Sequence, residues 1–455
     1  MPKQEFLAGV IEGFYGPPWS QQERFELFDW MAAWKLNTYV YAPKDDLKHR
    51  ALWRQTYSAP EARALAKVAS ACKRAGIRFV YALSPGLDIR YSNEEDLDRL
   101  RDRFAQMIGL GCHDFALLFD DIPDRLHPQD RKRWGTFAAA QCHVANTLFH
   151  WTRERCPQAR FLFCPTPYCG RMAARDLGGR DYLAVLGREL SPEIDVFWTG
   201  PEIISHKITV AHVRELQAIL HRKPVIWDNL HANDYDGRRF YCGPYSGRPL
   251  ELRQEVNGLL ANPNNEFPLN YMPLRTLARF VHSPSRPRWN ARQAYRSAMA
   301  EWRSRFATVG RPVTLRDLIL FGDCYYLPHE EGPEAEALYQ GLRRLVTTNP
   351  ANWGRQARAI RRQVARLRSF CGVTTELCHR PLFHALSRRI WELREELDLL
   401  GGYLELNSLK RRPGTACRSD FHLPGTYRGG LVARLQRLLI QQRDGTFARA
   451  RNVED

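Results

Sequence analysis

The chain has 455 residues, which is enough for two or three domains around a large hydrophobic core. It contains no run of about eighteen apolar residues, so no transmembrane helix is expected. The first residues lead directly into an apolar segment without the features of a signal peptide, which predicts a cytoplasmic protein. The 11 cysteines include no CxxC pair and no zinc-binding spacing, so we expect reduced, mostly buried thiols.

The formal net charge of +17 is concentrated in the second part of the chain. Residues 286–455 hold 30 Lys and Arg against 17 Asp and Glu, whereas residues 1–285 hold 37 against 33. Such a basic half could bind nucleic acid or acidic proteins. The simpler interpretation is a set of solvated, arginine-rich helix faces, and since no nucleic-acid-binding motif is visible we expect no nucleic-acid partner.

The first part of the chain alternates short apolar runs with longer amphipathic segments. The predicted strands are Phe6–Glu12, Thr38–Tyr41, Arg78–Leu83, Phe115–Phe119, Arg160–Cys164, Asp195–Trp198, Pro224–Trp227 and Glu266–Leu269. The predicted helices are Gln21–Trp34, Pro60–Ala75, Asn93–Leu110, Gln129–Arg155, Asp181–Leu190, Val210–His221 and Leu250–Leu260. This alternation predicts an α/β fold, a (β/α)8 barrel of the TIM type. A doubly wound open sheet is the alternative, but no topological switch point can be located for it.

Polar and aromatic clusters follow most of the predicted strands. They occupy residues 12–19, 42–46, 120–121, 165–170, 198–201 and 227–234. Enzymes with a (β/α)8 barrel build their active sites from the loops that follow the strands. The distribution of these clusters therefore predicts a functional site at the carboxyl end of the barrel.

Asp120 and Asp121 are the most informative of these residues, because they directly follow the apolar run Phe115–Phe119. Two carboxylates held together at the end of a buried strand cannot ionise independently, and catalytic sites use such pairs for acid and base chemistry. From this run alone, two other interpretations stay open. The pair could cap a helix or form a solvated turn, or it could bind a divalent metal ion.

Beyond Pro284 the sequence becomes helical. The predicted helices cover residues 288–306, 314–322, 333–347, 352–370 and 382–405. We expect three parts, namely the barrel over residues 1–285, an α-helical bundle over 286–409 and an extension over 410–455 with a loop and a helix near Leu431–Gln442. The tryptophans expected to anchor the bundle are Trp289, Trp302, Trp353 and Trp391. A large apolar face of this kind needs cover, which predicts a homodimer.

Taken together and in order, the clusters resemble the catalytic domain of family 84 glycoside hydrolases, the O-GlcNAcases and bacterial β-N-acetylglucosaminidases. The segments that carry the resemblance are GVIEGFYGPPWS, LNTYVYAPKDD, ALSPGLDI, ALLFDDI, FCPTPYCG, FWTGPEI, VIWDNLHANDYD and NPNNEFPLNY. The resemblance covers roughly residues 5–285, is weaker over the bundle and is missing over residues 410–455.

The resemblance implies a retaining exo-β-N-acetylglucosaminidase that uses substrate-assisted catalysis. In that mechanism the 2-acetamido oxygen of the sugar attacks the anomeric carbon and forms an oxazoline. Asp120 would orient the acetamido N–H, and Asp121 would act as general acid and then as general base. We expect an apolar environment and the charge of Asp120 to keep Asp121 protonated. Neither a metal ion nor a cofactor is implied.

The resemblance also implies sugar-binding roles, each with a structural alternative. The residues concerned are Gly13, Lys44, Tyr168, Trp227, Asn229, Asp234, Asn262 and Cys164. Tyr168 would bind the acetamido group, Trp227 would form a wall of its pocket and Cys164 would line the floor. Lys44 and the backbone of Gly13 would bind hydroxyl groups of the sugar. Asn229, Asp234 and Asn262 would do the same. The alternatives are a solvated lysine paired with Asp45, packed aromatic residues, and glycine or Asx residues that only form turns.

The chain differs from known members of the family. Eukaryotic O-GlcNAcases carry a long insertion and an acetyltransferase-like domain, and many bacterial relatives carry carbohydrate-binding modules, none of which is visible. The substrates implied are β-GlcNAc glycosides and O-GlcNAc-modified proteins. The alternatives are an endo-acting hyaluronidase or chitinase-like enzyme and a protein that binds nucleic acid through its basic half, whose binding would weaken steeply with salt.

Overall fold

The computed structural model describes residues 5–284, 289–408, 417 and 429–451. The chain divides into two compact units, and the first comprises Met1–Asp234, Tyr245–Phe267 and Leu277–Trp289. The second comprises Tyr235–Pro244, Pro268–Thr276 and Asn290–Asp455. The domain boundaries expected at residues 285 and 409 stay predictions.

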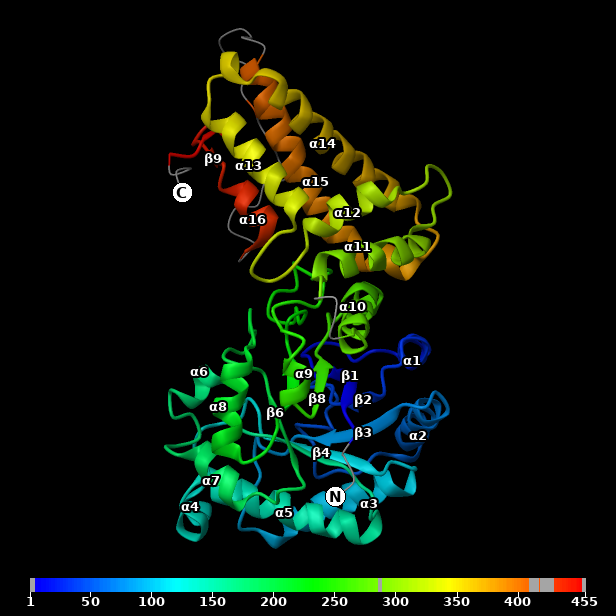
Figure 1. Ribbon diagram of the computed structural model, residues 1–455, viewed down its shortest axis with the longest axis vertical. Helices are drawn as coiled ribbons and strands as arrows, with labels where there is room; N and C mark the ends of the chain where they lie inside the picture. Colours follow the sequence, from blue (N-terminus) through cyan, green and yellow to red (C-terminus); the bar gives the residue numbers. More distant parts are fainter. Residues whose placement is uncertain (1–4, 285–288, 409–416, 418–428, 452–455) are drawn as a thin grey trace. The chain divides into compact units, whose positions relative to one another are not determined.

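The first unit is built on a closed barrel of eight parallel strands in the order β1 to β8 (Figure 1). Its strands are β1 Leu7–Glu12, β2 Thr38–Tyr41, β3 Arg78–Leu83, β4 Asp114–Leu118, β5 Phe161–Cys164, β6 Asp195–Trp198, β7 Val225–Asp228 and β8 Gly258–Ala261. Parallel pairing of β1 with β8, where Leu7 lies opposite Gly258, closes the barrel. The predicted (β/α)8 barrel is confirmed, and the open sheet is excluded.

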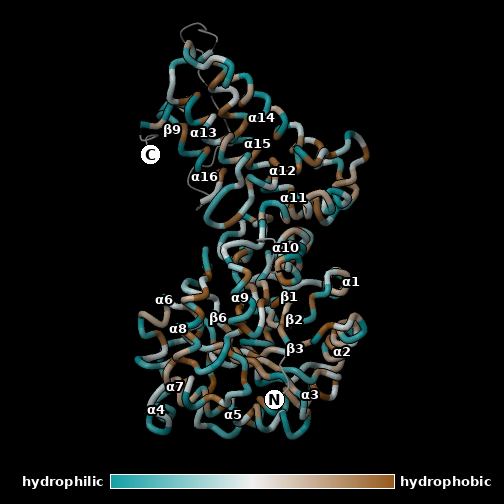
Figure 2. Tube along the Cα trace, viewed as in Figure 1, coloured by the Kyte–Doolittle hydropathy of each residue, from teal (hydrophilic) through white to brown (hydrophobic). Residues whose placement is uncertain are grey.

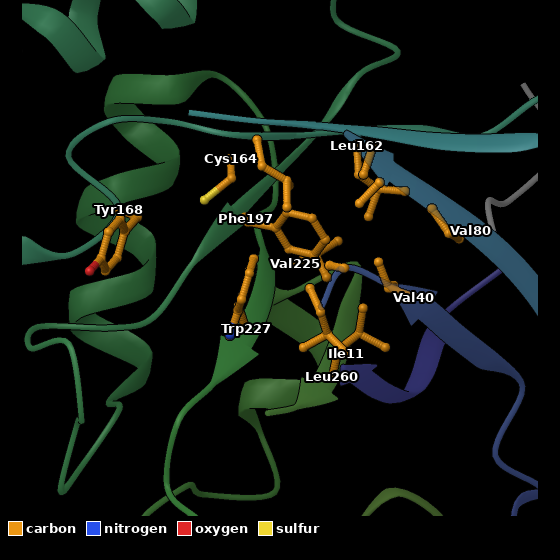
Figure 3. Packing of buried hydrophobic residues seen from close by; sticks show 14 of the residues in the cluster. Ile11, Val40, Val80, Leu162, Cys164, Tyr168, Phe197, Val225, Trp227 and Leu260 are labelled. Atoms are coloured by element: carbon orange, nitrogen blue, oxygen red, sulfur yellow. The ribbon is translucent and has the colours of Figure 1, made fainter. Parts of the chain in front are cut away.

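Side chains from all eight strands fill the interior of the barrel. The cluster includes Ile11, Val40, Val80, Leu162 and Val225, each fully buried and pointing toward the others (Figure 3). Strands buried on both faces are rich in Val, Ile and Leu, which is why they appear in the sequence as short apolar runs. Burying one such side chain stabilises the fold by roughly 1.5–3 kcal/mol, so the barrel provides a rigid base for the loops after its strands.

Helices cover the outside of the barrel. They are α1 Gln21–Ala33, α2 Ala59–Arg74, α3 Glu94–Gly109, α4 Pro128–Trp134, α5 Phe137–Arg155, α6 Gly170–Ala173, α7 Tyr182–Glu189, α8 Val210–Leu220 and α9 Leu252–Glu255. Ser20 and Glu23 form a capping box that fixes the start of α1. The single helix expected over Gln129–Arg155 is two helices, because Gly135 between α4 and α5 has a φ of 73° that a helix does not accept.

The prediction for the eighth strand was wrong. We expected Glu266–Leu269, but β8 is Gly258–Ala261, which overlaps the last three residues of the segment expected to be a helix. Residues Phe267–Asn270 form a short 3-10 helix instead. Four apolar residues next to an amphipathic stretch cannot be assigned to strand or helix from periodicity alone, which explains the error. Helix α10, Tyr271–Val281, was not predicted.

The second unit contains the predicted helical bundle. Its helices are α11 Ala291–Trp302, α12 Leu315–Asp323, α13 Pro333–Thr347, α14 Gly354–Val373 and α15 Arg380–Ser408. Apolar and polar residues alternate along α13 and α14 with helical spacing, as Figure 2 shows. Trp302 and Trp353 are buried as expected, whereas the side chain of Trp391 is 52% exposed.

The end of the chain differs from the predicted helix over Leu431–Gln442. Helix α16 covers only Gly430–Gln436, and it is followed by the antiparallel strands β9 Leu439–Gln441 and β10 Phe447–Arg449. The loop expected directly after residue 410 lies outside the described residues. In the part of the chain that the structure describes, no helix has the length and apolar character needed to cross a membrane.

Candidate active site

The expected site residues lie at or just beyond the carboxyl ends of the barrel strands. Gly13 follows β1, Lys44 follows β2, and Asp120 and Asp121 follow β4. Cys164 ends β5 and Tyr168 follows it, while Trp227 lies in β7. Asn229 and Asp234 follow β7, and Asn262 follows β8. Because all eight strands are parallel, these side chains converge at one end of the barrel.

Lys44 and Asp120 form a buried ion pair. The Lys44 Nζ atom lies 2.5 Å from Asp120 Oδ2, and both side chains are almost fully buried. Burial by itself raises the pKa of Asp120, but the charge and hydrogen bond of Lys44, followed by the charge of Arg50, outweigh it and lower the pKa. Asp120 is therefore held as a carboxylate. The Lys44 ammonium group supplies the positive charge that a metal ion would otherwise supply to this carboxylate.

Several polar atoms of this site are buried without a hydrogen-bond partner. They are Asp120 Oδ1, Trp227 Nε1 and Asn262 Oδ1. Leaving a buried donor or acceptor without a partner costs roughly 1–3 kcal/mol, and a bound polar ligand would remove this cost. Two of these atoms accept hydrogen bonds and one donates, which matches the amide and hydroxyl groups of a polar ligand.

Asp121 lies in a different environment from its neighbour. Its side chain is exposed and accepts hydrogen bonds from the hydroxyls of Tyr15, at 3.0 Å, and Tyr168, at 2.8 Å. The expected apolar environment is therefore wrong. Its backbone has a φ of 50°, a left-handed conformation that Asp accepts more readily than most residues. Arg50 donates a hydrogen bond of 2.7 Å to the Asp121 carbonyl oxygen, which stabilises this conformation.

Trp227 and Gly13 define one wall of the site. A Cβ atom added to Gly13 would lie 2.4 Å from Trp227 Cζ2, so only glycine lets the β1 loop approach the indole. The Lys44 ammonium group lies 5.4 Å from the centre of the indole ring. Cys164, Tyr168 and Trp227 belong to the cluster that closes the carboxyl end of the barrel core (Figure 3). Burial raises the pKa of Cys164, so this thiol is neutral.

The three Asx residues expected in the site are joined to its other loops. Asn262 donates through Nδ2 to Asn229 Oδ1 at 3.0 Å, and Asn229 donates to the carbonyl oxygen of Ile203 at 2.8 Å. Asp234 accepts a hydrogen bond of 3.0 Å from the backbone N–H of Tyr15, which follows β1. Asp234 thus connects the β7 loop to the β1 loop beside Asp121.

The structure adds three residues that sequence reasoning missed. Tyr15 and Arg50 contact Asp121, and the Arg50 guanidinium lies 5.5 Å from the centre of the Tyr15 ring. Tyr15 lies two residues after Gly13 in the same cluster, so its position was a usable signal. His49 is fully buried and bonds the carbonyl oxygen of Ala82 through Nδ1. Nothing in the sequence distinguishes this histidine from an ordinary loop residue.

Comparison with known proteins identifies the family. The family model of β-N-acetylglucosaminidases matches residues 8–311. The protein O-GlcNAcases of Mus musculus and Rattus norvegicus are each 46% identical over 280 residues, which is 62% of this chain but 30% of theirs. The chain thus spans less than a third of the length of these relatives. A mutant of the O-GlcNAc hydrolase of Thermobaculum terrenum is 30% identical, with a TM-score of 0.78 over 88% of this chain and 84% of that one.

The match of the family model covers the whole barrel and the start of the helical part. The similar bacterial structure extends the likeness to most of the bundle. The chain therefore belongs to the β-N-acetylglucosaminidases of glycoside hydrolase family 84, as its strand-end clusters predicted.

Proposed function

We propose that this protein is a retaining exo-β-N-acetylglucosaminidase that removes terminal β-linked GlcNAc, including O-GlcNAc on Ser and Thr of proteins. The observation that carries the proposal is how the two carboxylate oxygens of Asp120 are bonded. One oxygen of this carboxylate is held by Lys44, and the other is buried without a partner. This is the arrangement needed to accept the N–H of an acetamido group and to stabilise positive charge on it.

The first step follows from that arrangement. Asp120 Oδ1 accepts the acetamido N–H and turns the acetamido oxygen toward the anomeric carbon. The oxygen attacks, the bond to the leaving group breaks, and an oxazoline with a positively charged nitrogen forms. The buried carboxylate stabilises that charge better than water would, because it is already oriented. Tyr168, whose side chain is buried beside Asp120 and Asp121, would bind the acetamido group as it closes.

Asp121 is the proposed general acid and base. It donates a proton to the leaving oxygen in the first step and takes one from water in the second, when the oxazoline opens. The hydroxyls of Tyr15 and Tyr168 fix the direction of its carboxyl group.

The remaining residues would hold the sugar. Trp227 packs against the acetamide methyl group, and its unpartnered Nε1 atom is available to a hydroxyl group. Asn262 offers its unpartnered Oδ1, and Asn229, hydrogen-bonded to Asn262, fixes its orientation. Asp234, the backbone of Gly13 and Lys44 bind further hydroxyl groups, and Cys164 lines the floor. A polar set of this kind suits one terminal sugar residue.

The test separates exo-action from the endo-acting alternative. The enzyme is incubated with an O-GlcNAc peptide and with a chitin hexasaccharide, and the products are separated by anion-exchange chromatography. Exo-action yields free GlcNAc as the first product from both. Shorter oligosaccharides without early GlcNAc would show an endo-acting enzyme instead. Asp120→Asn should abolish most of the release, whereas Asp124→Asn, at an exposed position three residues after Asp121, should leave it intact.

The proposal extends to location and assembly. All 11 cysteines are free, which suits a reducing compartment such as the cytoplasm. A homodimer is proposed through the second unit, where Trp391 presents a large apolar side chain that is about half exposed.

A further inference from the structure

A second cavity lies in the helical unit and contains only residues of that unit. Its volume is about 630 Å³, and its lining residues come from α13, the start of α14 and the segment of β10. Its lining is dominated by arginine, with Arg343 and Arg344 from α13 and Arg449 and Arg451 from the segment of β10. Gln340 and Gln356 add neutral polar groups, and no Asp or Glu is among the described residues that line it.

Some other arginines of the unit form ion pairs, as Arg292 does with Asp323 at 2.6 Å and Arg366 with Asp317 at 2.7 Å. Within the described ranges, no carboxylate lies within 4.0 Å of Arg344, Arg449 or Arg451. Arg449 donates instead to the carbonyl oxygen of Thr347 at 3.1 Å, which fixes its guanidinium at the rim.

Positive charges gathered around one cavity repel one another unless an anion lies between them. The guanidinium group presents a planar fork of donors that matches phosphate oxygens two at a time, which an ammonium group cannot do. The volume falls in the range of small-molecule sites, roughly 300–1,000 Å³. It is too large for one phosphate group alone, and the glutamines at its edge offer both donors and acceptors to an organic part.

We propose that this cavity, here called the arginine cavity, binds the diphosphate group of a small organic phosphate. The site is separate from the glycosidase site and does not depend on the activity proposed for it.

The test is isothermal titration calorimetry of the full chain with inorganic pyrophosphate and with ADP. Both compounds should bind. Because the attraction is between charges, the affinity should fall when the salt concentration rises from about 50 to about 200 mM at a fixed pH. The double variant Arg344→Ala/Arg449→Ala should lose at least about tenfold in affinity, which corresponds to about 1.4 kcal/mol. Arg344→Ala alone should lose a smaller part, and since Arg344 is exposed this variant should fold normally.

The matched control is Arg358→Ala, an exposed arginine on α14 outside the cavity. It should bind pyrophosphate as the unchanged chain does. An equal loss in this variant would show diffuse attraction to a basic surface and overturn the proposal. So would the absence of binding to the unchanged chain.

Two further outcomes would also contradict the proposal. If a single-stranded RNA binds with the same dependence on Arg344 and Arg449 while pyrophosphate does not, the ligand is a nucleic acid. If pyrophosphate binds only after Glu454→Gln/Asp455→Asn, then the chain's own carboxylates fill the cavity. Unchanged glycosidase activity in all these variants would confirm that the two sites are independent.

Discussion

Asp120 and Asp121 are adjacent in sequence, but they have opposite environments. Asp120 is buried against Lys44, whereas Asp121 is exposed and accepts hydrogen bonds from two tyrosine hydroxyls. The left-handed backbone at Asp121, with φ of 50°, is what turns the second carboxylate away from the first. The proposed mechanism needs two such environments, because it keeps one carboxylate charged while its neighbour exchanges protons with the substrate.

Asp121→Asn tests the second role. Loss of a general acid should reduce kcat by about 10²–10⁴-fold on an O-GlcNAc peptide, whose alkoxide leaves poorly without a proton. With 4-methylumbelliferyl β-N-acetylglucosaminide, the rate of the first step should fall much less, because this leaving group needs little protonation. Kinetics on both substrates give the comparison, with Asp124→Asn as the exposed control. Equal losses of kcat on the two substrates would show that Asp121 is not the general acid.

His49 should make the stability of the barrel depend on pH. Burial, and then the positive charge of Lys44, lower its pKa from 6.5 to about 4. The unfolded chain therefore takes up this proton first, so stability is complete above about pH 6.5 and falls as the pH drops toward 4. Between pH 7 and 5 the loss from this group should be about 2 kcal/mol.

Urea unfolding at the two pH values measures that loss. His49→Asn should unfold with a smaller difference between pH 7 and 5 than the unchanged chain. His150→Asn, at an exposed position on α5, should keep the full difference. An unchanged pH dependence in His49→Asn would show that other groups cause it.

At the scale of elements, the loop after β1 depends on a glycine. Gly13 lies against the Trp227 indole, and a Cβ atom there would approach Cζ2 to 2.4 Å. Gly13→Ala should therefore displace either the loop or the indole. A shift of about 1 Å in a catalytic group can lower kcat/KM by about 100-fold, and the added methyl group should cost roughly 1–3 kcal/mol of stability.

The control for this variant is Gly109→Ala. Gly109 ends α3, and a Cβ atom there would meet nothing within 4 Å. This control should keep full activity and equal or greater stability, since alanine favours helices. Full activity in Gly13→Ala would show that the β1 loop does not shape the site.

The sequence predicted seven of the eight strands because each is a short apolar run followed by a polar cluster. It failed at β8, where Gly258–Ala261 continues an amphipathic segment without a clear boundary. The site was predictable where a residue lies in a strand-end cluster, as for Asp120 and Lys44. Arg50 and His49 were not, because their roles depend on contacts made only in the folded chain, with Asp121 and Ala82.

At the scale of the whole molecule, the bundle leaves the large apolar side chain of Trp391 about half exposed. Trp391 is 52% exposed, whereas Trp302 and Trp353 are buried. We predict that light scattering gives twice the chain mass of 52.8 kDa and that Trp391→Ser shifts it toward the monomer. Val309→Ser, at a position that is 87% exposed, is the control and should stay dimeric. A monomeric unchanged chain would rule out the dimer.

The two units carry different kinds of charge and chemistry. The barrel concentrates acidic and aromatic groups at the carboxyl ends of its strands, where a rigid core supports them. The second unit pairs some of its arginines with carboxylates, as in Arg292 with Asp323, and gathers four others at the arginine cavity.

The central claim is that the substrate's own acetamido oxygen attacks the anomeric carbon while Asp120 holds the acetamido N–H. The most direct measurement compares kcat/KM for 4-methylumbelliferyl β-N-acetylglucosaminide with kcat/KM for its N-trifluoroacetyl analogue. Fluorine withdraws electrons from the attacking oxygen, so the account predicts a steep fall, of about 100-fold or more, for the analogue. Equal rates on the two substrates would show that water or a protein carboxylate attacks instead and would contradict the account.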